Sequence, residues 1–294
     1  MNKWKGKSKG TILGYRIFVW CMKNLGVRSS YFVLYFVAAY YFLFEKKSNL
    51  YISYYFKNRL NFSSFKSKIS VYKSYFTFGQ VLIDKTAISA GLREKYTYEF
   101  DGIDILRQLL AEKKGGVLIS AHIGNFEVAE HFFADIDFDC QISLVTTDQE
   151  VTVIKEYLES ISVKKSNMKF IYVKDDLSHI FEINEALSNN ELICFTGDRY
   201  FEGSKFLEAD LLGKSAKFPA GPFMIASRLN VPVVYVYVMK EKNLYYHLFA
   251  RRAENVKKRD AQGLLHSYTQ NLESMIQKYP LQWFNYFDFW DDVD

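Results

Sequence analysis

The stretch GGVLISAHIGNFEVAEHFF, residues 115–133, decides the fold class of this 294-residue chain. Val117–Ala121 is a continuous apolar run, which is typical of a parallel strand covered on both faces. Asn125 is then predicted to be the N-cap of a helix with an aromatic face. His122 and Glu127 therefore flank a corner between a strand and a helix, where α/β proteins place their chemistry.

Outside this stretch, apolar runs and helical patterns alternate from about residue 96 onward. Such alternation predicts an α/β fold, with a mostly parallel or mixed sheet covered by helices on both faces. We expect one α/β domain over residues 93–294, preceded by a helical region over residues 1–92. Strands are expected near residues 96–100, 116–121, 141–146, 169–173, 191–195, 231–239 and 244–250, and helices near residues 102–112, 125–134, 150–162, 177–188, 221–229 and 260–278.

The charge of the chain is divided unevenly along its length. Residues 1–100 hold 17 Lys and Arg against 4 Asp and Glu, whereas residues 101–294 hold 21 against 29. The basic part is also rich in Tyr and Phe within apolar helical stretches, which favours an anionic membrane surface as its partner. The α/β part shows no basic face or known module of a nucleic-acid reader, so we expect no nucleic acid. A solvated basic surface is the alternative.

The most apolar segment of the basic part is Tyr31–Phe44. As a helix of 14 residues it would be about 21 Å long, which is shorter than the hydrocarbon core of about 30 Å. Arg28, Lys46 and Lys47 bracket it, so we expect it to lie in the membrane interface or to dip into it. The alternatives are a short tilted span and a helix that packs on the α/β domain.

His122 and Glu127 are candidates for acid–base chemistry. A carboxylate on the first helical turn can fold back toward the imidazole and hydrogen-bond one ring nitrogen, which makes the other nitrogen a general base. The alternative is a capping histidine with an ordinary first-turn glutamate, which the helix dipole favours.

Two later turns are candidates for substrate binding. Leu192–Gly203 is a strand that runs into Asp198 and Arg199, and an arginine at the end of a strand can hold a phosphate or carboxylate. Asp198 and Arg199 could equally pair with each other. The third block, KFPAGP, holds Lys217, Gly221 and Pro222; the proline suits the first position of a helix, and the glycine allows a close approach to a ligand. A turn without a ligand would explain the same residues.

The order of these blocks resembles the bacterial lipid A biosynthesis acyltransferase family, within the lysophospholipid acyltransferase superfamily. HIGNFE is followed by GDR with FEG, then by KFPAGP with a helix and PVV, and finally by YPLQWFNYFDFW. The resemblance spans nearly the whole chain. The GDR block with FEG is closer to the branch of the family that has no established role in lipid A, so glycine or ornithine lipids, polyene lipids and glycolipid precursors all stay open as acceptors.

The resemblance implies transfer of an acyl chain from an acyl-carrier protein or acyl-CoA thioester to a membrane lipid, at the cytoplasmic face of the inner membrane. His122 would be the base and Glu127 would orient it, with Asn125 and nearby backbone N–H groups stabilising the oxyanion. Asp198, Arg199, Gly221, Pro222 and Lys217 would line the substrate site, and no cofactor or metal is expected. An acidic carrier protein would need a basic rim, for which the candidates are Lys113, Lys114, Lys217, Arg251, Arg252 and Lys257–Arg259.

Other classes of function fit the sequence less well. A catalytically silent binding module on the same fold has no need of a base, and a thioesterase-like hydrolase would use the same corner. A serine hydrolase would show a G-x-S-x-G elbow, and no such motif is present. Cys21, Cys140 and Cys194 are far apart, which predicts reduced thiols and no disulfide framework.

Overall fold

The computed structural model describes residues 12–133, 140–146, 168–174, 176–254 and 256–293, which form two units. A helical unit runs from the amino terminus to Tyr96 and includes the carboxyl-terminal segment from Ile276 onward. An α/β unit comprises residues 97–148 and 166–275. The chain therefore divides after Tyr96, and the carboxyl-terminal segment from Ile276 groups with the helices and not with the sheet.

The helical unit contains α1 (Ile12–Leu25), α2 (Val27–Phe44), α3 (Lys46–Tyr54) and α4 (Ser64–Ala87). Helix α2 has 18 residues and is therefore longer than the apolar run from which it was predicted. It begins at Val27 because Gly26 takes a φ of 86°, which ends α1, and the Ser29 hydroxyl then donates to the Gly26 carbonyl at 2.6 Å. By length and composition, α2 is the one helix of the described residues that could cross a membrane.

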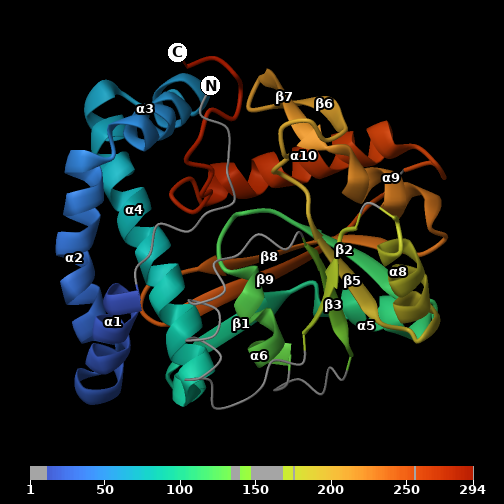
Figure 1. Ribbon diagram of the computed structural model, residues 1–294, viewed down its shortest axis with the longest axis horizontal. Coiled ribbons are helices and arrows are strands. Elements are labelled where there is room, and N and C mark those ends of the chain that lie inside the picture. The colour runs from blue at the N-terminus through green and yellow to red at the C-terminus, as the bar shows by residue number, and fades with distance from the viewer. Residues whose placement is uncertain (1–11, 134–139, 147–167, 175, 255, 294) are drawn as a thin grey trace. The chain divides into compact units, whose positions relative to one another are not determined.

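The α/β unit is built on a seven-stranded sheet in the order β1-β9-β8-β2-β5-β3-β4 (Figure 1). Five neighbouring strands from β8 to β4 are parallel, while β9 runs antiparallel to β8 and pairs in parallel with β1. The strands are β1 (Thr97–Asp101), β2 (Gly116–Ser120), β3 (Ile142–Thr146), β4 (Lys169–Tyr172), β5 (Leu192–Thr196), β8 (Val233–Lys240) and β9 (Tyr245–Arg252). The helices are α5 (Ile103–Ala111), α6 (Ala129–Phe133), α8 (His179–Ser188), α9 (Ala220–Arg228) and α10 (Ala261–Lys278).

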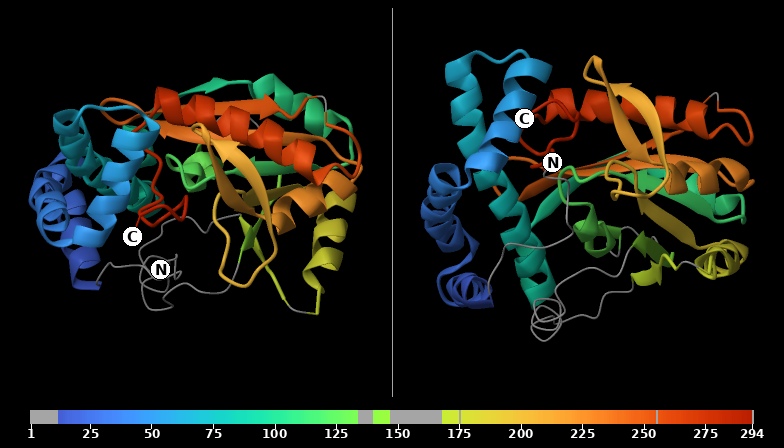
Figure 2. Two further views of the ribbon diagram at one scale, coloured as in Figure 1. Left: turned by 90° about the horizontal axis from the view of Figure 1, so that it is seen from above. Right: turned by 45° about the horizontal axis from the view of Figure 1, so that its top comes forward.

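Helices cover both faces of this sheet. Ile119 pairs with Tyr235 on the neighbouring strand, and the Tyr235 ring packs on Tyr268 of α10 at 5.8 Å. Leu118 points to the other face, because side chains alternate along a strand, and there it lies with Phe126 beneath the segment that follows β2. Figure 2 shows α10 running across its face of the sheet. The predicted mixed sheet is therefore present. Every residue of β2 and of its neighbour β5 is buried, apart from Thr196.

Three local predictions differ from the structure. The helix expected over residues 125–134 is a 3-10 turn, η4 (Phe126–Val128), followed by the short α6. Pro222 is the third residue of α9, because that helix already begins at Ala220. An antiparallel hairpin of β6 (Phe206–Leu211) and β7 (Lys214–Pro219), which was not expected, leads into α9. The helix expected over residues 150–162 lies outside the described residues.

Candidate active site

The corner after β2 is held against β8 by backbone contacts. Gly124 forms a bridge to Val238, and the Asn125 N–H donates to the Val238 carbonyl at 2.7 Å. Gly124 has a φ of +62°, and a Cβ at this position would lie 2.1 Å from the Val238 oxygen. A glycine is therefore required here, so that the chain can turn beside β8 and present His122 at the end of β2.

His122 and Asp198 meet although they are far apart in the sequence. Strands β2 and β5 are parallel neighbours with Ser120 opposite Thr196, so the residues two places beyond each strand lie side by side. The Gly197 N–H donates to the Ser120 carbonyl at 2.9 Å and extends this pairing past the strands. The two turns that the sequence singled out therefore form one site.

The Asp198 carboxylate holds His122 at two points. Both of its oxygens lie 3.0 Å from the His122 backbone N–H, and one of them lies 2.7 Å from Nδ1 of the ring. Asp198 is fully buried, whereas 27% of the His122 side chain is exposed. A carboxylate at Nδ1 favours the tautomer with the proton on Nδ1, so Nε2 is the nitrogen that can accept a proton.

The electrostatic surroundings keep His122 neutral. Burial, and then the positive charge of Arg199, lower the pKa of His122 below its ordinary value. The carboxylates of Asp198 and Glu127 act in the opposite direction but do not outweigh them. An imidazole that is unprotonated near neutral pH and bonded at Nδ1 to a buried carboxylate has the properties of a general base.

The other residues predicted at the corner have different surroundings. At Nδ1 the carboxylate that accepts the orienting hydrogen bond is Asp198, where the sequence suggested Glu127. The charge of Glu127 also acts on the ring. Asn125 occupies the expected N-cap position, but its side chain makes no capping bond. Its Nδ2 instead donates to the hydroxyl of Tyr246 at 3.3 Å, and the side chain is buried.

The remaining predicted residues lie on the segment that follows Asp198. Arg199 is half-buried next to it, and its charge reaches the His122 ring. Lys217 is on β7, with its Nζ 5.4 Å from the centre of the Phe206 ring, and Phe206 in turn lies 5.9 Å from Tyr200. Gly221 and Pro222 are in the first turns of α9, and a Cβ on Gly221 would meet open space, so the fold itself does not require a glycine there.

Sequence reasoning missed Tyr268 of α10. Its hydroxyl donates to the Ser120 carbonyl at 3.0 Å, the same acceptor that Gly197 uses. Burial, together with the charge of Asp198, raises the pKa of Tyr268 well above its ordinary value, so it remains a neutral donor. Its place in an amphipathic helix indicated only a core residue, because nothing in the local pattern shows which strand the helix crosses.

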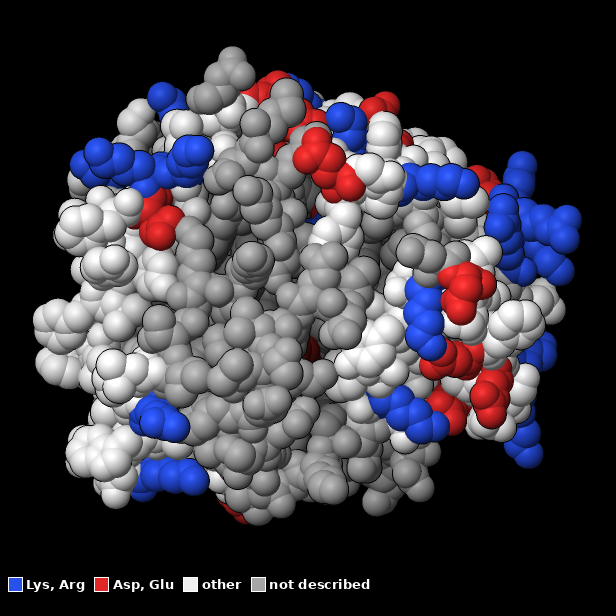
Figure 3. Space-filling model, viewed as in Figure 1, with Lys and Arg blue, Asp and Glu red and all other residues white. Residues whose placement is uncertain are grey.

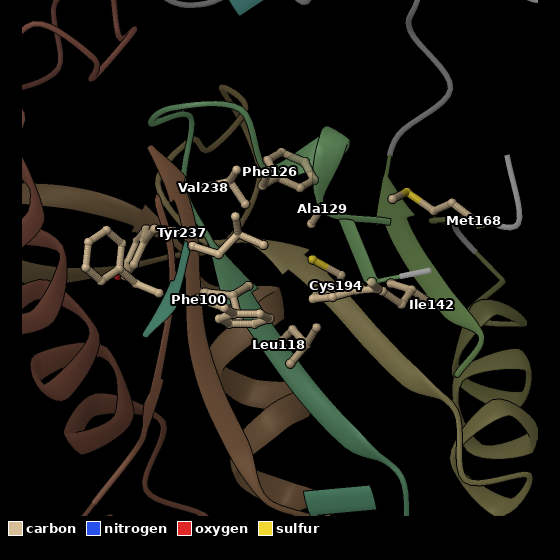
Figure 4. A pocket seen from close by; sticks show the side chains of 13 residues that line it. Phe100, Leu118, Phe126, Ala129, Ile142, Met168, Cys194, Tyr237 and Val238 are labelled. Atoms are coloured by element: carbon tan, nitrogen blue, oxygen red, sulfur yellow. The ribbon is translucent and has the colours of Figure 1, made fainter. Parts of the chain in front are cut away.

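An apolar cavity lies beneath the segment that begins with His122 (Figure 4). It is lined by 13 residues, and the side chains of Phe126, Ala129, Leu118 and Cys194 gather around it. Its empty space is about 460 Å³ when the part open to solvent is included. Burial raises the pKa of the Cys194 thiol to about 12, so this cysteine is an apolar wall and not a nucleophile.

Most of the proposed basic rim lies away from His122. Lys113 and Lys114 precede β2, and Lys257–Arg259 follow β9. Because β9 runs opposite to β8 and β2, both groups are at the end of the sheet where β2 begins. Arg252 pairs with Glu112 at 2.9 Å near the same edge. His122 follows the other end of β2, and Lys217 is the candidate whose aromatic neighbours connect it to the Asp198 turn.

Comparison with known proteins identifies one family. A family model described as bacterial lipid A biosynthesis acyltransferase matches residues 9–290. No curated protein matches the chain. Within the residues that the structure describes, no group of His, Cys, Asp and Glu side chains could hold a metal ion.

Proposed function

Because the chain belongs to the bacterial lipid A biosynthesis acyltransferase family and is an acyltransferase, we propose that it acylates a membrane lipid from an acyl thioester with His122 as the base. The acceptor is a hydroxyl or amine of a membrane lipid or glycolipid precursor, and the donor is acyl-carrier protein or acyl-CoA. The observation that carries this proposal is the hydrogen bond that the buried Asp198 carboxylate accepts from Nδ1 of a half-buried, neutral His122.

The proposed reaction needs one base and no covalent enzyme intermediate. Nε2 of His122 takes the proton of the acceptor as its oxygen or nitrogen attacks the thioester carbonyl. The tetrahedral intermediate then expels the thiolate as the carbon–sulfur bond breaks, and His122 returns the proton to the sulfur. Asp198 and Glu127 stabilise the imidazolium that exists between these two steps, because their charges favour the protonated ring.

The positive charge of Arg199 is proposed to stabilise the oxyanion of the tetrahedral intermediate. The oxyanion of the intermediate needs a donor or cation aimed at it, and Arg199 is close enough for its charge to act on His122. Asn125 is a weaker candidate than the sequence suggested, since its N–H and Nδ2 already bond Val238 and Tyr246. Lys217, Gly221 and Pro222 are proposed to contact the headgroup of the acceptor or the phosphopantetheine arm of the donor.

The cavity next to the corner is proposed to hold the acyl chain. Its lining is almost entirely apolar, which is the surface that a saturated acyl chain needs. Phe126 and Ala129 connect this cavity directly to the segment that carries His122. The reaction is proposed to take place at the cytoplasmic face of the inner membrane, with α1 and α2 in contact with the lipid.

The proposed function is tested with the purified protein in mild detergent, radiolabelled acyl-carrier protein thioester and a total lipid extract. We expect wild type to make a new acylated lipid, and His122→Ala to lose roughly 10²–10⁴-fold in rate. His266→Ala is the matched control, because His266 is an exposed histidine of α10. Label released only as free fatty acid in a His122-dependent way would show a thioesterase, and an absence of any turnover would favour a silent binding module.

A further inference from the structure

Helix α2 carries one bare apolar stripe along its length. Phe32, Phe36 and Phe44 are each about two-thirds exposed, at 65%, 66% and 66%. Helix α1 adds a second stripe at helical spacing, in which Trp20 is 60% exposed. Exposed apolar surface of this extent indicates an interaction site. The members of the two stripes are Leu13, Ile17, Trp20, Phe32, Tyr35, Phe36, Tyr40, Leu43 and Phe44.

The opposite side of α2 is packed against α4 from one end to the other. Tyr31 bonds the buried Asp84 near the start of α2, and the Tyr41 ring lies 5.9 Å from Tyr75 near its end. Between them, Leu34 lies so close to Gly79 that a Cβ there would be 2.3 Å from its side chain. Helix α2 is therefore packed along its length against α4, and it is not an isolated membrane-anchoring helix.

A further protein layer lies behind the middle of α4. The Ser74 hydroxyl donates to the Leu281 carbonyl at 3.2 Å, and the Phe78 ring lies 4.9 Å from Phe284. Lys73, on the same stretch of α4, is exposed. If α2 crossed a bilayer, a lysine and a segment with several carboxylates would have to enter the hydrocarbon with it, which is strongly unfavourable.

The connections of α4 to the rest of the chain argue in the same direction. At the carboxyl end of α4, the Tyr96 hydroxyl donates a hydrogen bond to Asp84 at 2.9 Å, and β1 begins at the next residue, Thr97. Before the amino end of α4, the Tyr55 hydroxyl donates a hydrogen bond to the Pro280 carbonyl at 2.9 Å, and Pro280 lies two residues after the end of α10. A crossing α2–α4 pair would place these two connections on opposite sides of the membrane, although the chain enters and leaves the same α/β unit next to them.

Basic side chains stand at both ends of the stripes. Lys23 and Arg28 are exposed at the turn between α1 and α2, and Lys46 and Lys47 are exposed just after α2. In Figure 3 the left edge of the molecule, over α1 and α2, is largely white between groups of blue side chains. Basic side chains at both ends of a helix are stabilised by anionic headgroups when the helix lies parallel to the membrane surface. Insertion with the turn leading would instead carry Lys23 and Arg28 into the hydrocarbon.

We propose that α1 and α2 lie flat in one leaflet of an anionic membrane and that neither helix crosses it. The apolar stripes enter the acyl layer, the basic ends meet the phosphates, and α4 stays on the aqueous side. This inference rests on the membrane association in the proposed function, but it concerns topology and is independent of which lipid is acylated.

The first test is sided labelling in bacterial membranes. Arg28→Cys, Phe36→Cys and Lys47→Cys are each introduced into a chain in which Cys21, Cys140 and Cys194 are replaced by Ala, and retained activity shows folding. A membrane-impermeant maleimide is applied to spheroplasts and to inverted vesicles. We expect positions 28 and 47 to react in the inverted vesicles alone, and position 36 to react only after detergent. Positions 28 and 47 labelled from opposite sides would show that α2 crosses the membrane.

The second test distinguishes lipid from another protein as the occupant. Phe36→Glu is compared with Phe181→Glu, since Phe181 is a 78% exposed phenylalanine on α8. We expect Phe36→Glu to weaken binding to anionic vesicles at least about tenfold and Phe181→Glu to leave it unchanged. Unchanged vesicle binding by Phe36→Glu, or its conversion of a dimer to a monomer, would overturn the proposal. Both readouts are independent of acyl transfer, so a failure here is separate from a failure of the proposed function.

Discussion

At the level of single residues, the pKa of His122 depends on charges that oppose one another. Arg199 lowers that pKa, whereas Asp198 and Glu127 raise it, and burial adds to the effect of Arg199. Because the net shift is downward, the neutral base persists at a pH below the ordinary histidine value of about 6.5. The activity is therefore expected to fall on the acid side only below that pH.

Two substitutions should move this acid limb in opposite directions. Arg199→Gln removes a positive charge, so the pKa of His122 rises and the limb of kcat/KM moves to higher pH. Asp198→Asn removes the carboxylate, so the limb moves to lower pH while the rate falls by about 100-fold or more, since the ring also loses its orienting partner. The measurement is a pH profile of kcat/KM for both variants. If the limb moved in the same direction in both, the pKa of His122 would not be set by these two charges.

At the level of elements, the strand-to-helix corner joins the base to the apolar cavity. The 3-10 turn and α6 both contribute side chains to the cavity, through Phe126 and Ala129, directly after the segment with His122. A side chain added on α6 therefore shortens the space for an acyl chain without touching the base.

Ala129→Phe should change which acyl chains are used. We expect it to reduce kcat/KM at least about tenfold for the longest chains that wild type accepts and to preserve shorter ones, because each lost methylene position matters in a packed pocket. The measurement is kcat/KM over a series of saturated acyl donors. Ala111→Phe is the matched control, since Ala111 is exposed at the end of α5. An equal loss for every chain length would place the acyl chain elsewhere.

At the level of the whole molecule, the distribution of charge separates possible docking sites. The basic groups at the beginning of β2 are at the opposite end of that strand from His122, and part of their charge is neutralised by Asp101 and Glu112. Lys217 lies on the hairpin that follows the Asp198 turn, beside the exposed Phe206. An acidic carrier protein that delivers a thioester to His122 is therefore expected to meet Lys217 and not Lys257.

Charge reversal tests this difference. Lys217→Glu should raise KM for acyl-carrier protein by about three- to tenfold, most strongly at low salt, because like charges then repel. Lys257→Glu should leave that KM unchanged. The check is KM at low and high salt for each variant, with the same acyl chain on coenzyme A as a further comparison. An equal effect of both variants would mean that the carrier protein docks by overall charge alone.

Much of the architecture can be predicted because it depends on local pattern. The apolar runs near residues 117–121 and 192–196 correspond to the strands β2 (Gly116–Ser120) and β5 (Leu192–Thr196), and the amphipathic stretch near residues 260–278 is α10. The sequence does not predict the hairpin of β6 and β7, since both strands are half-exposed and lack a continuous apolar run, and only Gly213 marks their turn. Similarly, α2 begins at Val27, ahead of the apolar run Tyr31–Phe44 that predicts it, because Gly26 and the Ser29 hydroxyl determine the start of the helix and hydrophobicity does not.

The sequence alone determined the alternation of strands and helices, the polar turns after two apolar strands, and the basic, aromatic character of the amino-terminal part. Each of these depends on neighbours within a few residues, so a period or a motif is enough to show it. Only the tertiary structure decided that Asp198, 76 residues from His122, is the carboxylate at Nδ1, and that α4 covers one side of α2. These contacts depend on which strands become neighbours and which helices pack together. That arrangement is determined by burial of apolar surface over the whole chain, which no local pattern shows.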